Sequence, residues 1–374
     1  MLIECLPTAN LTVFYAAVQA FEKNSSIQSL IVFLPEGNAW SDDEINQACA
    51  MMSKPIIGGV FPQIIFDQQC HSEGALLIGT EACLNVRTLE FSNGVVASDV
   101  AEQLLNLYPQ HEQDNTLLVI VDGLATGMTN LVGELFNHFG LDIGFVGGGA
   151  GSLTLVPKPC VLTNAGIQQG VAAVALLNCR AGIGVAHGWQ PISEAYRVTE
   201  SDGNHVISLN WQPAFDVYKQ EIFKHSQRDI STDNFFEIAK AYPLGLTTLG
   251  EEFVIRDPIM TENSHLVCVG DVPQGSFVHL MNGDIHTIPA AAMRARDRAA
   301  LMFDAEEAPT FQLFIDCISR MLFLGASFEQ ELNHVVETSV PTVGALTLGE
   351  IANNGHDYLE FYNKTAVVAL MKDI

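Results

Sequence analysis

The chain has 374 residues, with 17 Lys or Arg against 43 Asp or Glu, so its formal charge is −26. A phosphate backbone and an anionic membrane surface repel so acidic a chain unless it carries a basic cluster, and the sequence contains none. Nucleic acid and membrane surfaces are therefore excluded as partners. Hydrophobic residues make up 48% of the chain and charged residues 16%, which is typical of a folded protein of two or three domains.

The first residues lack the basic start and the small-residue cleavage site of a signal peptide. The longest apolar run, Val171–Leu177, falls far short of the roughly 18 residues that a membrane span needs. The eight cysteines are scattered and none belongs to a C-x-x-C pair, which predicts free thiols and no structural zinc site. We therefore expect a cytoplasmic protein without membrane insertion.

Two segments of the chain follow the same order of strand, helix, strand ending in Gly-Gly, loop and apolar strand. In the first copy these elements fall at 29–35, 41–52, 54–59 and 73–79. In the second they fall at 116–122, 128–139, 143–148 and 169–175. The third copy, at 311–317, 327–336, 342–351 and 365–371, is weaker. The pattern predicts a duplicated unit and suggests a third.

The first strand of each copy is apolar at both parities, which predicts a parallel pair covered on both faces. The later strands can pair as antiparallel hairpins. A different stretch follows the second copy: a hairpin over 196–209, a helix from Pro213 to about Phe223, and a polar segment over 224–234. We predict an α/β (α+β) fold in which repeated strand–helix–strand–hairpin units form mixed sheets, with two domains at 1–225 and 226–374.

The stretch Gly144–Ser152 is the most conspicuous local pattern. Glycines allow close backbone approach and can point successive N–H groups at a carboxylate or phosphate. The stretch is no dinucleotide fingerprint, because the Leu153–Pro159 segment after it cannot begin a helix, and no P-loop Lys-Ser/Thr pair follows. Two interpretations remain open at this point: a ligand-binding turn, or a tight turn or bulge between strands.

Glu350 falls in a segment that is otherwise apolar, where an unpaired carboxylate would be costly. It needs a partner, and Arg320 is the natural choice, either as a structural ion pair or as part of a site. Cys317 lacks a nearby His that could act as its base, so a packed thiol is favoured over a nucleophile. No G-x-S-x-G or H-E-x-x-H motif is present. The sequence thus contains no catalytic constellation, and we expect no enzyme.

His187 lies beside an apolar strand, in Val185–Trp189. A neutral imidazole there could ligate a haem iron axially, while a surface or hydrogen-bonded His is the alternative. No C-x-x-C-H motif is present, which excludes covalent haem attachment.

Eight short stretches carry a resemblance to the FIST family, a bacterial intracellular sensory domain with an N-terminal and a C-terminal part. They follow the family's order over nearly the whole chain: Gly144–Ser152, Ala186–Pro191, Val198–Ala214, Tyr242–Gly245, Arg256–Pro258, Phe314–Arg320, Gly349–Ala352 and Asn363–Thr365. A further stretch, Gly58–Ile65, departs from the usual pattern and looks closer to the stand-alone, NosP-type branch of haem proteins that sense nitric oxide.

The resemblance implies a signal-input protein that binds a small ligand, or haem with nitric oxide as the signal. The implied output is a separate histidine kinase or cyclic-di-GMP enzyme in trans, as in two-component systems, and a homodimer remains open. We expect the ligand to bind between the N- and C-terminal parts and to shift their arrangement. The expected ligand-binding residues are Gly147, Gly148, Gly149, Ala150, Gly151, Arg320, Gly349, Glu350, Asn363 and Thr365, with His187 as the haem ligand.

Three alternatives remain open beside the haem sensor. One is a sensor of an amino-acid-like molecule without haem. Another is an enzyme that uses Cys317 or Glu350 on a small acidic or amide substrate. The last is a purely structural or oligomerising protein.

Overall fold

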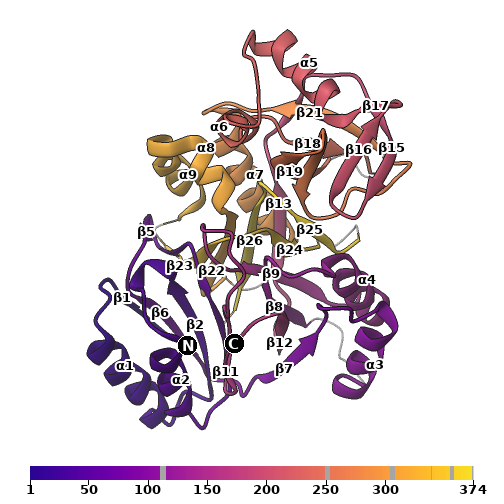
Figure 1. Ribbon diagram of the computed structural model, residues 1–374. Coiled ribbons are helices and arrows are strands. Elements are labelled where there is room, and N and C mark those ends of the chain that lie inside the picture. Colours follow the sequence, from indigo (N-terminus) through magenta and orange to yellow (C-terminus); the bar gives the residue numbers. More distant parts are fainter. Residues whose placement is uncertain (110–114, 249–252, 304–307, 338, 354–357, 373) are drawn as a thin grey trace.

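Three copies of one structural unit make up most of the molecule in the computed structural model, and a smaller lobe lies against the third copy (Figure 1). The structure describes residues 1–109, 115–248, 253–303, 308–337, 339–353, 358–372 and 374. Each copy consists of a strand, a helix, a parallel strand pair joined by a helical segment, a hairpin and a last strand. The structure therefore confirms the predicted repeat, including its weaker third copy.

The first copy runs through β1 (Leu2–Leu6), α1 (Leu11–Lys23), β2 (Ser29–Pro35), α2 (Asp42–Ala50), β3 (Ile56–Phe61), β4 (Gln63–Phe66), β5 (Gln69–His71) and β6 (Ala75–Thr80). The second runs through β7 (Asn85–Glu90), α3 (Ala97–Leu107), β8 (Thr116–Asp122), α4 (Met128–Phe139), β9 (Gly144–Ala150), β10 (Val161–Thr163), β11 (Gly166–Gln168) and β12 (Val171–Leu177). Strands β2 and β8 are buried along their whole length, as their apolar sequence predicts.

The third copy runs through β13 (Gly182–Ala186), α7 (Thr287–Met302), β22 (Phe311–Cys317), α8 (Ile318–Leu324), α9 (Phe328–Val335), β23 (Thr342–Thr347), β24 (Glu350–Ala352), β25 (Glu360–Tyr362) and β26 (Ala366–Met371). The strand expected over 342–351 is in fact two strands, because the chain turns at Gly349 and β24 joins another sheet. Helix α8, which directly follows β22 and carries Arg320, was missed by the prediction of a single helix over 327–336.

The insert lobe comprises the elements between β13 and α7. They are β14 (Gln190–Pro191), β15 (Tyr196–Asp202), β16 (His205–Leu209), β17 (Gln212–Pro213), α5 (Ala214–Ser226), α6 (Phe235–Ala239), β18 (Leu244–Leu246), β19 (Val254–Glu262), β20 (His265–Val269) and β21 (Phe277–Asn282). Their strands form a separate antiparallel sheet, seen at the top of Figure 1. The division predicted between residues 225 and 226 falls in this lobe, at the end of α5, and stays a prediction.

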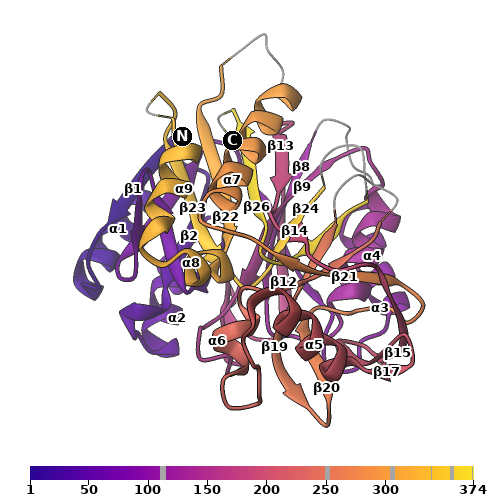
Figure 2. The same cartoon turned by 90° about the horizontal axis from the view of Figure 1, so that it is seen from above.

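Each copy donates its hairpin to the sheet of a neighbouring copy. The β4–β5 hairpin of the first copy pairs with β23 of the third, β10–β11 of the second pairs with β3 of the first, and β24–β25 of the third pairs with β9 of the second. The exchange is cyclic, so every copy has a six-stranded sheet of mixed direction that it does not complete by itself. Figure 2 shows α1 and α2 on one side, α3 and α4 on the other, and the strands of the third copy between them.

The parallel pairs share one packing device. Gly58, Gly147 and Gly344 occupy the same register, opposite Val32, Val119 and Phe314 on the first strand of each pair. A Cβ atom at any of the three would lie 1.8–1.9 Å from the carbonyl oxygen of that opposite residue. Only glycine lets the backbones approach so closely, so these glycines are structural.

Among the described residues, no helix combines the length and the apolar character that crossing a membrane would need.

We predict that Gly344→Ala lowers the free energy of unfolding by about 1–3 kcal/mol, because the new methyl group must displace the Phe314 carbonyl. Gly133→Ala on α4 is the matched control, since a Cβ there meets no atom within 4 Å and Ala is the better helix former. Urea unfolding of both variants measures the difference. Equal stability of the two variants would contradict the packing role.

Candidate functional site

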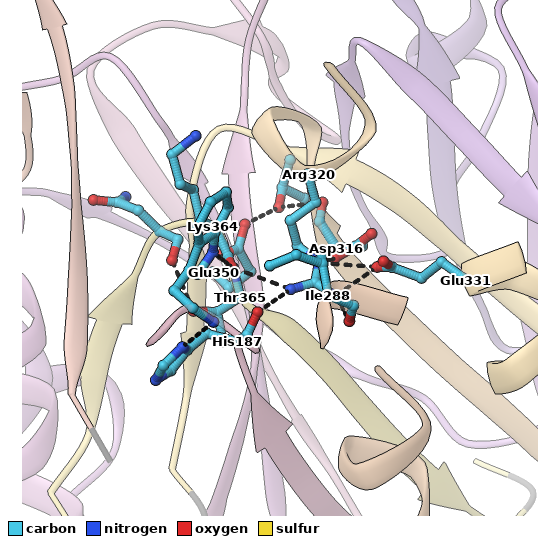
Figure 3. Close-up of polar contacts among 11 residues, drawn as sticks. His187, Ile288, Asp316, Arg320, Glu331, Glu350, Lys364 and Thr365 are labelled. Carbon is cyan, nitrogen blue, oxygen red and sulfur yellow. Dashed lines mark hydrogen bonds and ion pairs between the residues drawn. The ribbon is translucent and has the colours of Figure 1, made fainter. Parts of the chain in front are cut away.

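A cluster of buried polar side chains lies at the carboxyl end of β22, where the insert lobe meets the third copy (Figure 3). Four carboxyl groups and two cations form this polar cluster, and none of the six residues is more than 2% exposed. They are Asp257, Asp316, Glu331, Glu350, Arg320 and Lys364.

The cluster breaks the internal symmetry of the molecule. Asp316 is equivalent to Leu34 and Val121 of the first two copies. In each copy this position lies two residues after the one that pairs with the glycine of the parallel strand. Glu350 opposes Gly148 in the sheet register, and the equivalent hairpin positions hold Ile64 and Val161. The first two copies thus have apolar side chains at both equivalent positions, so the fold itself does not require carboxyl groups there.

Arg320 is fully buried and its guanidinium contacts five segments, one of them through the Lys364 carbonyl, which accepts from Nη1 at 3.3 Å. Its Nε lies 2.9 Å from Asp316 Oδ1, and its Nη2 lies 2.8 Å from Glu331 Oε1 on α9. Nη1 also donates to the His187 carbonyl at 2.7 Å and Nη2 to the Ile288 carbonyl at 3.0 Å. The expected Arg320–Glu350 pair is therefore wrong. The carboxyl groups that pair with the guanidinium are those of Asp316, four residues before Arg320, and of Glu331.

Lys364 connects the third copy to the insert lobe. It is fully buried, in the turn before β26, and its Nζ lies 3.1 Å from Asp257 Oδ2 on β19 and donates to the Lys240 carbonyl at 3.0 Å. Ser319 donates to the same Asp257 oxygen at 2.7 Å. Trp189 Nε1 donates to the Lys364 carbonyl at 3.1 Å, and the Lys364 ammonium lies 5.2 Å from the Trp189 ring.

Glu350 accepts hydrogen bonds from three neutral donors: the Thr347 hydroxyl at 2.9 Å, the Thr365 backbone N–H at 3.3 Å and the Cys317 thiol. Burial raises the pKa of its carboxyl to about 8, although these hydrogen bonds act in the opposite direction. Burial also raises the pKa of the adjacent Cys317 thiol well above its ordinary value. A thiol held in its protonated form is a poor nucleophile.

Asp316 and Glu331 both approach the same Arg320 nitrogen, each with an oxygen 2.9 Å from Nε. Two carboxyl groups held so close together do not both ionise readily. Burial, and then the neighbouring Glu331, raise the pKa of Asp316 well above its ordinary value.

The glycine-rich stretch is not the turn that the sequence suggested. Strand β9 runs straight through Gly144–Ala150, with Gly148 opposite Glu350. The Gly149 N–H donates to the Gly349 carbonyl at 2.8 Å, and the Gly151 N–H donates to the Val60 carbonyl at 2.8 Å. These two N–H groups are therefore already used by the protein. The glycines are explained by crowding, since a Cβ at Gly149 would lie 2.4 Å from the Leu348 carbonyl oxygen.

The structure brings several of the expected ligand-binding residues together. Gly148, Gly349, Glu350 and Thr365 are neighbours through the β9–β24 pairing and the Thr365 hydrogen bond. Asn363 precedes them in the same turn as Lys364, and its Oδ1 has no hydrogen-bond partner among the described residues. Gly147 packs against Val119, and Ala150 and Gly151 lie at the far end of β9.

Sequence reasoning missed Asp257, Asp316, Glu331 and Lys364 as members of the cluster. Asp257, Asp316 and Lys364 stand inside motifs that carried the family resemblance, but nothing local indicated that they would meet. Glu331 gave a usable signal, because Phe328, Leu332 and Val335 form the buried face of α9 and Glu331 lies within it.

The polar cluster is closed in this arrangement. Three cavities can be described, and the six residues of the cluster line none of these three. The largest of these, about 820 Å³, is an open groove between the β4–β5 hairpin and the start of β23. A small apolar cavity of about 10 Å³ lies where Ile31, Leu118 and Leu313 of the three copies meet.

Comparison with known proteins places this three-copy α+β body with its insert lobe in a class of sensor domains. A FIST N domain model matches residues 28–212 and a FIST C domain model matches residues 214–353, so the chain belongs to the FIST family. Domains of this family act in signal transduction and bind small ligands.

The chain is also similar to the uncharacterized protein MJ1623 of Methanocaldococcus jannaschii, with 26% identity over 110 residues. That similarity covers 26% of this chain and 21% of the relative, so the chain spans about a fifth of the length of the curated relative that it matches.

We predict that Lys364→Met lowers the free energy of unfolding by about 3–5 kcal/mol, because it leaves the buried Asp257 carboxylate without its cation. Lys240→Met is the control: the Lys240 side chain forms only an exposed pair with Glu237, so its loss costs less than about 1 kcal/mol. Denaturant titration of both variants checks the difference. Wild-type stability of Lys364→Met would show that the pair does not hold the lobe.

Proposed function

We propose that this protein is a signal-input protein whose small-ligand site is the polar cluster between the third copy and the insert lobe. One observation carries the proposal: carboxyl groups occupy, in the third copy alone, core positions at which the first two copies have Leu, Val or Ile. Buried carboxyls lower stability unless they are compensated, so their presence in one copy of three favours a function over a packing role.

The unsatisfied atoms of the cluster favour one kind of ligand. Asp257 Oδ1, Glu331 Oε2 and Asn363 Oδ1 are buried acceptors with no hydrogen-bond partner among the described residues. A ligand that donates hydrogen bonds, such as one with an ammonium group, would satisfy them. This favours the amino-acid-like alternative over the haem sensor.

Binding requires the junction to open, because the cluster is closed in the present arrangement. Opening would separate two contacts of the third copy. One is the pair of Lys364 with Asp257 of the insert lobe, and the other is the hydrogen bond from Arg320 to the carbonyl of His187, which directly precedes the lobe. A ligand that binds only the opened form shifts the equilibrium by its differential affinity for that form. The movement of the insert lobe would be the signal.

We predict that a panel of free amino acids, tested one at a time by thermal shift, contains a ligand that stabilises the protein. A ligand present at 100 times its Kd adds about 2.7 kcal/mol. Glu350→Gln and Arg320→Lys, each tested with that ligand, should weaken its binding at least about tenfold, which is the loss of one charge-assisted hydrogen bond. Glu329→Gln, an exposed change on α9, is the control, and unchanged affinity in both site variants would refute the placement.

The family resemblance also implies a more specific function, in which the protein binds haem and senses nitric oxide. The surroundings of His187 do not fit a macrocycle in this arrangement. Its Nδ1 accepts a hydrogen bond from the Trp189 N–H at 3.0 Å, the residue is 8% exposed, and it lies outside the three cavities.

An absorption spectrum tests this directly. Protein mixed with haem should show no Soret shift that depends on His187, because the imidazole is buried against the chain. A shifted Soret band that responds to nitric oxide and disappears in His187→Ala would restore the haem sensor.

The proposed output is a separate cytoplasmic protein, a histidine kinase or a cyclic-di-GMP enzyme in trans, with a homodimer of this chain as a further option. A change in the autophosphorylation rate of a candidate kinase on adding this protein, with and without ligand, would support the kinase.

A further inference from the structure

The polar cluster contains more buried acids than buried cations. Asp257, Asp316, Glu331 and Glu350 face only Arg320 and Lys364, so full ionisation would leave two uncompensated negative charges in a region closed to water. A nearby third cation, Arg256, does not supply the missing charge. Its guanidinium donates to three backbone carbonyls, and Glu360 is the carboxylate that acts on it most strongly.

Every element packed around Glu350 contributes to this balance. The groups that face it are the Cys317 thiol from β22, Asp316 from the same strand, Arg320 from α8 and, next to the thiol, Lys364 and Asp257. Its direct hydrogen-bond donors, the Thr347 hydroxyl, the Thr365 N–H and the Cys317 thiol, are neutral. The two cations of the region are already engaged by other carboxyls, so neutrality at Glu350 requires a proton.

A second proton is required at the Asp316–Glu331 pair. Both carboxyls approach Arg320 Nε at 2.9 Å, and one guanidinium cannot neutralise both. Burial and the neighbouring Glu331 raise the pKa of Asp316 well above its ordinary value, so a proton on Asp316 leaves one negative charge opposite one positive charge.

We propose that the closed junction between the insert lobe and the third copy holds two protons, one at Glu350 and one at Asp316, so that its opening releases protons and becomes more favourable as the pH rises. The junction is then a proton-dependent latch. This inference concerns how the junction opens and does not depend on which ligand enters.

The direction follows from linkage. The pKa of Glu350 is raised from 4.5 to about 8 in the closed form, so that form binds the proton more tightly than an opened, hydrated one. The preference for the closed form is complete below about pH 4.5 and is lost as the pH rises to about 8. Release of one proton per opening event changes the opening equilibrium tenfold per pH unit within this range.

Three free cysteines provide the measurement in the full-length protein. Cys317 is buried beside Glu350, Cys268 is buried in the insert lobe, and Cys83 is exposed. Iodoacetamide labelling followed by peptide mass spectrometry gives the rate at each. The rate at Cys83 corrects for the intrinsic pH dependence of alkylation, and the rate at Cys268 reports unfolding of the lobe.

We expect the Cys317 rate, divided by that of Cys83, to rise by more than tenfold per pH unit between pH 6 and 8 in the wild type and in the control Glu329→Gln, because more than one proton leaves on opening. The slope should fall by about a factor of ten per pH unit in Glu350→Gln, because this variant removes one of the two protons. Asp316→Asn is a second variant, in case Glu350→Gln does not fold. It should likewise lower the slope by about a factor of ten per pH unit, and a wild-type slope in this variant would overturn the proton at Asp316.

A Cys317 ratio that does not change with pH would overturn the latch, as would a Glu350→Gln variant with the wild-type slope. A Cys268 rate that rises in parallel with that of Cys317 would also overturn it, because the exposure would then come from unfolding of the lobe and not from opening of the junction.

Discussion

The contact on which the rest of the site depends is the buried guanidinium of Arg320. Without it, Asp316 and Glu331 would face each other while fully buried, and the His187 and Ile288 carbonyls would lose their donor. One side chain therefore fixes the end of β22 relative to α7, α9 and the first residue of the insert lobe. The planar fork of Arg suits this role, because each of its nitrogens meets a partner from a different segment.

The position of the site follows from where the repeat is interrupted. The insert lobe enters the third copy between β13 and α7, so only this copy is covered at the carboxyl ends of its strands by a second domain-like layer. Crevices at the carboxyl ends of parallel strands are the usual place for ligands in open α/β sheets. The first two copies keep apolar side chains at the matching positions and act as scaffold.

Periodicity and spacing predicted the repeat, the mixed sheets and the α5 helix, because these depend on local patterns of burial. The importance of Glu350 was also predictable, since a lone carboxylate in an apolar segment is a local anomaly. The partners of Arg320 were not predictable from the sequence. Asp316 lies only four residues before it, but Glu331 belongs to α9 and Lys364 to a turn 44 residues further along the chain. The glycine stretch misled for a similar reason, because the carbonyl that crowds Gly149 belongs to Leu348, far along the chain.

The exchanged hairpins have a consequence for how this protein can be divided. A copy cut out of the chain would lose two strands from its own sheet and would strip two strands from a neighbour, leaving bare edges on both. Each of the three copies therefore needs a second copy to complete its sheet, so we expect none of the three to fold when it is isolated. Any shuffling of this architecture between proteins would have to move all three copies at once.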